Sequence, residues 1–102
     1  MSRTLLETRD GAVRLSEAAL GEIVRRAVAS VEGARLRRGR RRLGVELAQG
    51  RARAELQLAV RYGLVLPEIA AAVQQAVAAA LERMCEVEVE AVDVTVEALE
   101  GP

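Results

Sequence analysis

The sequence contains no histidine, one cysteine and one aromatic residue, Tyr62, in 102 residues. Without histidine the chain lacks the most common general base, the Ser-His-Asp triad and most zinc sites. The single Cys85 cannot form a disulfide within the chain, and it follows an apolar helical pattern, so we expect a small buried side chain. No glycine pattern matches a P-loop or a dinucleotide fingerprint. We therefore expect no catalytic residue, no cofactor and no small-molecule substrate.

Carboxylates are the remaining candidate metal ligands. Glu86, Glu88 and Glu90 alternate along a predicted strand, a spacing that a divalent cation could use weakly. Charged residues on a strand edge also discourage pairing with other chains. We favour the second interpretation and predict no metal site.

Long apolar runs are also missing. No stretch approaches the roughly 20 apolar residues that span a bilayer, and the first residues lack the apolar core of a signal peptide. We therefore expect one small domain with an aliphatic core, located in the cytoplasm, where an unpaired cysteine is usual.

The charges balance overall but not along the chain. Residues 1–53 hold thirteen arginines and six acids, whereas residues 54–102 hold two arginines and nine acids. This asymmetry could drive head-to-tail association or recruit a charged partner. We favour the simpler interpretation, in which the two sets face each other or solvent within the fold.

Two helices are predicted from apolar residues that recur at steps of three and four. Ser16 fits an N-cap, and Gly33 is expected to close the first helix. Pro67 suits the first helical position of the second helix. The predicted buried residues are Leu20, Ile23, Val24, Ala27, Val28 and Val31 in the first helix, and Ile69, Val73, Ala76, Val77, Ala80 and Met84 in the second.

Period-two alternation predicts strands over 43–48 and 52–61, joined in a hairpin by a turn at Gln49-Gly50. The alternation changes phase near Glu90-Ala91, which predicts a bulge or a bend where the chain enters the last strand. The element order is (β)-α-(β)-β-β-α-β, an α+β fold with two helices on one face of a small mixed sheet. Residues 11–99 form the domain, 1–10 an edge strand or flexible tail, and 100–102 a tail.

Two surfaces stand out as candidate contacts. An arginine-rich loop could hold an anionic lipid surface, an acidic protein or nucleic acid, or could be merely solvated; its residues are Arg35, Arg37, Arg38, Arg40, Arg41 and Arg42. Nucleic acid is disfavoured because no aromatic platform accompanies these arginines. Opposite the buried stripe of the second helix lies a face with little charge, a putative partner interface made of Ala71, Gln75, Ala78, Ala79 and Glu82.

The most specific sequence pattern is Y-G-x-x-x-P-E-I-A with V-Q and E-x-M further on. It includes Tyr62, Gly63, Pro67, Glu68 and Gln74, and the wider match comprises Val31-Glu-Gly-Ala34, Val77, Glu82-Arg-Met84 and Val92-Asp-Val-Thr-Val96. Over residues 11–99 the chain resembles the alkaline shock protein 23 family of bacterial envelope stress response proteins. It departs from that family in its arginine-rich loop and after the E-x-M segment, where the usual glycine of the family is Val87 here or is displaced.

The resemblance implies a non-catalytic cytoplasmic protein near the inner face of the cell membrane, which self-associates or docks on an envelope-associated protein. It implies no catalytic or ligand-binding residues. Within the signature we expect Gly63 and Pro67 to set backbone geometry, and Tyr62 to be a packing anchor with a polar tip. The alternative function is a small nucleic-acid-binding domain that uses residues 35–42.

Overall fold

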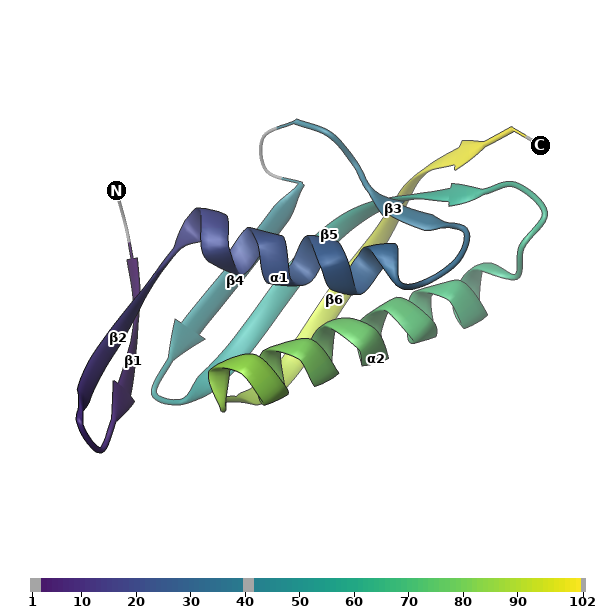
Figure 1. The fold of residues 1–102 in the computed structure, drawn as a ribbon. Helices are drawn as coiled ribbons and strands as arrows, with labels where there is room; N and C mark the ends of the chain where they lie inside the picture. The colour runs from purple at the N-terminus through teal and green to yellow at the C-terminus, as the bar shows by residue number, and fades with distance from the viewer. Residues whose placement is uncertain (1–2, 40–41, 102) are drawn as a thin grey trace.

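The computed structural model describes the backbone of residues 3–39 and 42–101, and all their side chains except those of residues 3–5, 7 and 8. Figure 1 shows the order of the elements. These are β1 (Arg3–Thr8), β2 (Gly11–Ser16), α1 (Glu17–Ala29), β3 (Ala34–Leu36), β4 (Leu43–Ala48), β5 (Arg51–Arg61), α2 (Leu66–Cys85) and β6 (Glu88–Glu100).

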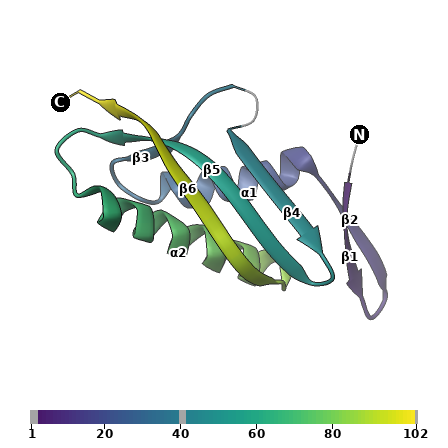
Figure 2. The same cartoon turned by 180° about the vertical axis from the view of Figure 1, so that it is seen from behind.

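The central strand of the sheet is β5. On one side it pairs antiparallel with β4 and, further along, with β3; on the other side it pairs parallel with β6. Both helices lie over the same face, and the opposite face is uncovered (Figures 1 and 2). The predicted α+β fold, its mixed sheet and the hairpin through Gln49-Gly50 are therefore confirmed.

The bulge predicted in the last strand is also confirmed. Ala52 pairs with Val89 and the next residue, Arg53, pairs with Ala91, so Glu90 is an extra residue in β6. This insertion shifts the side-chain alternation, which places Val92 opposite Ala54 on the buried side. A second shift follows Leu58, and β6 continues to Glu100, one residue beyond the predicted domain boundary.

The first residues pair differently from the expected edge strand. β1 and β2 form a two-stranded sheet of their own, beside the start of α1 and apart from the main sheet (Figure 1). Leu6 and Leu15 are half-buried against the core. A two-stranded hairpin needs such packing, because alone it is at best marginally stable in water.

Helix α1 begins as predicted and ends earlier. Ser16 Oγ accepts a hydrogen bond from the Ala19 amide at 3.0 Å, which satisfies an otherwise unpaired donor of the first turn. The helix ends at Ala29, and Ser30 is its right-handed C-cap. Gly33 lies beyond it with φ +90°. Glycine is favoured there because L side chains rarely adopt this backbone conformation, whereas an added Cβ would meet mainly the movable end of the Leu64 side chain.

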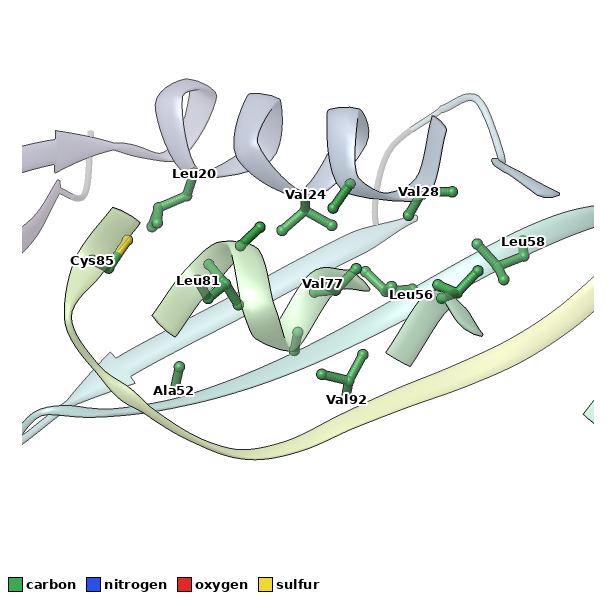
Figure 3. Packing of buried hydrophobic residues seen from close by; sticks show 14 of the residues in the cluster. Leu20, Val24, Val28, Ala52, Leu56, Leu58, Val77, Leu81, Cys85 and Val92 are labelled. Atoms are coloured by element: carbon green, nitrogen blue, oxygen red, sulfur yellow. The ribbon is translucent and has the colours of Figure 1, made fainter. Parts of the chain in front are cut away.

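The core lies between the helices and the covered face of the sheet (Figure 3). The buried side chains of α2 are Val73, Val77, Ala80, Leu81 and Cys85. Met84, which we predicted to be buried, is 59% exposed. The prediction was wrong because residues 73, 77, 81 and 85 form a single i, i+4 ridge. Such a ridge is inclined to the helix axis, so over successive turns the buried side rotates from the Met84 direction toward Cys85.

Candidate interaction surfaces

The outer face of α2, defined as Ala71, Gln75, Ala78, Ala79 and Glu82, points away from the core. Four of these residues are exposed and Ala78 is half-buried against the core cluster. Ala71, Gln75, Ala78 and Glu82 follow one another at steps of four, three and four. This is the spacing of a seam along which two helices pack. The small side chains on it would allow a second helix to approach closely.

Gln74 fixes the orientation of this face relative to the sheet. Its side-chain Nε2 donates a hydrogen bond to the Val92 carbonyl of β6 at 3.0 Å. Gln74 and Ala78 are one helical turn apart, so Ala78 lies on the same flank of α2. The outer face therefore adjoins β6, which, like β3 and β4, pairs only with β5 among the described strands of this sheet.

Two of the five acidic residues of β6 are matched by arginines of β5. Arg51 Nη1 lies 3.1 Å from Glu90 Oε1, and Arg53 Nη2 lies 3.4 Å from Asp93 Oδ2. These pairs join the arginine-rich half of the sequence to its acidic half, as the favoured interpretation of the charge asymmetry predicts. All four side chains are about half exposed, so each pair contributes about 0–1 kcal/mol.

The arginines of the predicted loop have different partners. Arg35 lies in β3 rather than in the loop, and its guanidinium holds the Glu100 carboxylate with both Nε, at 2.9 Å, and Nη2, at 2.5 Å. The hydrogen bond from Arg35 lowers the pKa of the Glu100 carboxyl. Arg42 donates from Nε to the Arg38 carbonyl at 3.1 Å and from Nη1 to the Gln57 side-chain oxygen. Arg40 and Arg41 lie outside the described residues.

Gln57 closes the base of this loop. Its carbonyl accepts a hydrogen bond from the Arg37 amide at 2.9 Å, and its own amide donates to the Arg42 carbonyl at 3.0 Å. Both ends of the connection from β3 to β4 are thus tied to one residue of β5. Sequence reasoning missed this role, because the alternation of the strand indicated only that Gln57 faces away from the core.

A groove of about 1030 Å³ lies between α1 and this connection. We call it the arginine groove. Its apolar lining comes from Ala18, Gly21, Val28, Ala29, Leu36 and Leu43, and its charged lining from Glu17, Glu22, Arg25, Arg35, Arg37, Arg38 and Arg42. Glu22 is paired with Arg26 at 2.7 Å and more loosely with Arg25 at 3.6 Å. The groove therefore carries an excess of positive charge.

The signature residues have mainly structural surroundings, with one exception. Gly63 has φ +100°, as the turn into α2 requires, and Pro67 is in the first turn, after the N-cap Val65. The Tyr62 amide donates to the Glu100 carbonyl at 2.7 Å. The Tyr62 side chain is 67% exposed, so it is not the packing anchor that we predicted.

In the part of the chain that the structure describes, no three Cys, Asp or Glu side chains converge as metal ligands. Cys85 is 5% exposed, as expected from its pattern, and burial raises the pKa of its thiol. No helix among the described residues has the length and apolarity needed to cross a bilayer.

The chain matches one known protein family. The profile of the alkaline shock protein 23 family, described as having a cell envelope-related function, matches residues 34–100. No curated protein matches the chain.

Among solved structures, the fold is similar to that of the MamM CTD. Its zinc form is 24% identical with a TM-score of 0.62, over 81% of this chain and 86% of that one. Its manganese form is 23% identical with a TM-score of 0.61, over 81% and 99%. At these identities the likeness shows the fold alone.

Proposed function

The chain belongs to the alkaline shock protein 23 family, which has a cell envelope-related function, and from this premise we propose that it is a non-catalytic interaction module. The module self-associates and docks envelope-associated protein at the cytoplasmic side of the membrane. The observation that carries the proposal is the outer face of α2, whose exposed residues are small or uncharged except for Glu82. A solvated helix face usually carries more charge.

The spacing of the face supports a two-fold contact between two α2 helices. When two copies pack antiparallel about a point midway between Gln75 and Ala78, each Gln75 meets the other copy's Ala78, and each Ala71 meets the other copy's Glu82. A long side chain then faces a short one at every position, which suits close packing. The two Glu82 carboxylates lie at opposite ends of the contact, about 16 Å apart along the helix axis.

The unpaired edge of β6 offers a poorer self-contact. Glu90 and Asp93 are paired with arginines of β5, but the exposed residues of β6 also include Glu88 and Glu97, and two such strands would bring these like charges together. Directly opposed like charges destabilise strand pairing, and acidic edges are a common protection against it. We therefore assign self-association to α2.

The test is sedimentation velocity over a range of protein concentrations with a pair of opposite substitutions at Ala71. In the two-fold contact Ala71 faces Glu82 of the other copy. Ala71→Glu should weaken self-association, because two carboxylates then meet, whereas Ala71→Arg should preserve or strengthen it. Gln49→Glu, on the exposed β4–β5 turn, is the charge-matched control and should leave the mass unchanged. A wild-type protein that stays monomeric, or equal effects of Ala71→Glu and Ala71→Arg, would contradict the proposal.

A further inference from the structure

We infer that the arginine groove is a second binding site, and that it takes an extended acidic segment of another polypeptide. This inference goes beyond self-association, since the groove lies on α1 and the β3–β4 connection and shares no residue with the outer face of α2. Its ligand is recognised by carboxylates that meet the arginines and by apolar side chains that meet the groove floor.

The charges available to a ligand are those without a partner in the protein. Arg35 is held by Glu100, and Arg42 by Gln57 and the Arg38 carbonyl. Within residues 3–39 and 42–101, the guanidinium groups of Arg37 and Arg38 have no hydrogen bond or ion pair, although the charge of Arg37 helps to lower the pKa of the Glu100 carboxyl. Two unpaired guanidinium groups on one wall of a groove match carboxylates in the bidentate manner that arginine favours.

The base that presents these arginines is fixed before any ligand arrives. Gln57 holds the Arg37 amide and the Arg42 carbonyl, and Arg42 in turn holds the Arg38 carbonyl. A ligand would therefore order only the ends of the Arg37 and Arg38 side chains. Binding to a pre-organised site costs less conformational entropy than binding to a free loop.

The shape and the mixed lining favour a polypeptide over other anions. A flat lipid surface does not enter a groove. The single aromatic residue, Tyr62, does not line the groove, so bases have no stacking platform there. The apolar floor instead suits side chains that alternate with carboxylates along an extended strand.

The size of the groove sets the length of the ligand. Helix α1 has 13 residues, which corresponds to a length of about 20 Å. An extended segment of about six residues covers that length. A fluorescein-labelled peptide of about eight residues, with alternating glutamate and valine, is therefore a suitable probe.

Fluorescence anisotropy of this probe with the full chain tests the inference. The wild-type protein should bind it, and more weakly as salt increases. The Arg37→Glu/Arg38→Glu double variant should lose about tenfold or more in affinity, since two attractions become repulsions. Arg83→Glu, on the exposed end of α2, should stay within about twofold of wild type. A peptide with glutamine in place of glutamate should not bind.

A second variant separates the groove from a general charge effect. Ala18→Trp places a large side chain in the groove from an exposed position on α1 without changing any charge, and it should also abolish binding. Failure of the wild-type protein to bind the probe would overturn the inference. Binding of the probe by the double variant or by Ala18→Trp with the same affinity as the wild-type protein would also overturn it. So would groove-dependent binding of a DNA oligonucleotide or of phosphatidylglycerol vesicles in place of the peptide. All binding measurements use a protein concentration at which the chain sediments as a single species. A failure of the self-association proposal would therefore be distinguishable from a failure of the groove to bind the probe.

Discussion

Separate replacement of Leu81 and Met84 by alanine tests which side of α2 is buried. That assignment determines whether the outer face of α2 lies in solvent. Leu81 is fully buried, whereas Met84 is 59% exposed only three residues later. A Leu→Ala change at a fully buried site costs about 2–5 kcal/mol, because apolar contacts are lost and a cavity remains. A change at an exposed site usually alters stability by about 0.5 kcal/mol or less.

The decrease in the free energy of unfolding caused by Leu81→Ala should lie in the upper half of the range for a fully buried leucine. Leu81 packs in a cluster that includes Val24, Val77 and Val92, drawn from both helices and the sheet (Figure 3). A cavity bounded by three elements closes less easily than one beside a loop, and the cost increases with the residual volume. The same phase that buries Leu81 turns Ala71, Gln75 and Ala78 outward.

Urea unfolding followed by circular dichroism measures both effects. With an m-value of about 1–3 kcal/mol per molar urea, Leu81→Ala should lower the midpoint by about 1 M or more, and Met84→Ala by a few tenths of that. The m-values should remain equal to that of the wild-type chain. A Met84→Ala variant as destabilised as Leu81→Ala would refute the helix phase, and with it the assignment of the outer face.

Three further predictions concern single contacts. Ser16→Ala should lower the free energy of unfolding by about 1 kcal/mol, through loss of the N-cap of α1, whereas Ala29→Ser at its exposed end should change it by less than half as much; urea titration measures both. Gln74→Leu should accelerate amide hydrogen exchange in β6 around Val92, because the Val92 carbonyl loses its partner, and unchanged exchange would exclude a docking role for Gln74. Burial raises the pKa of Cys85, so the folded state holds the thiol proton more tightly than the unfolded state. Cys85 therefore favours the fold below the usual thiol pKa of about 8.5, and this contribution is lost at higher pH. Between about pH 8 and 10, the free energy of unfolding should decrease more for the wild-type chain than for Cys85→Ala. Parallel plots of the free energy of unfolding against pH would refute this prediction.

Strands β4, β5 and β6 were predictable because their residues mostly alternate between an inner and an exposed side, which produces a period of two in the sequence. Even the bulge at Glu90 was visible, since one extra residue reverses that alternation for the rest of β6. Which side of α2 is buried was harder to predict from the sequence. Its alanines suit either side of a helix, and only the packed ridge of residues 73, 77, 81 and 85 decides which side is buried.

The candidate surfaces were predictable as sequence segments, but their contacts were not. The sequence shows six arginines between residues 35 and 42, but it does not show that Glu100 holds one of them from 65 residues away. The role of Gln57 likewise depends on β3 and β4 meeting the same strand at different points. Tyr62 was expected inside because aromatic side chains bury a large apolar area, whereas its place in the turn after β5 leaves it in solvent.

The most direct measurement of the central claim is disulfide cross-linking between two single-cysteine variants in a Cys85→Ala background. Gln75→Cys copies mixed with Ala78→Cys copies should form the mixed dimer under mild oxidation, in excess over either homodimer, because the two positions meet across the two-fold contact of α2. Gln49→Cys, on the exposed β4–β5 turn, is the control and should cross-link only slowly. If the mixed dimer forms no faster than the Gln49→Cys dimer, the outer face of α2 is not the self-contact.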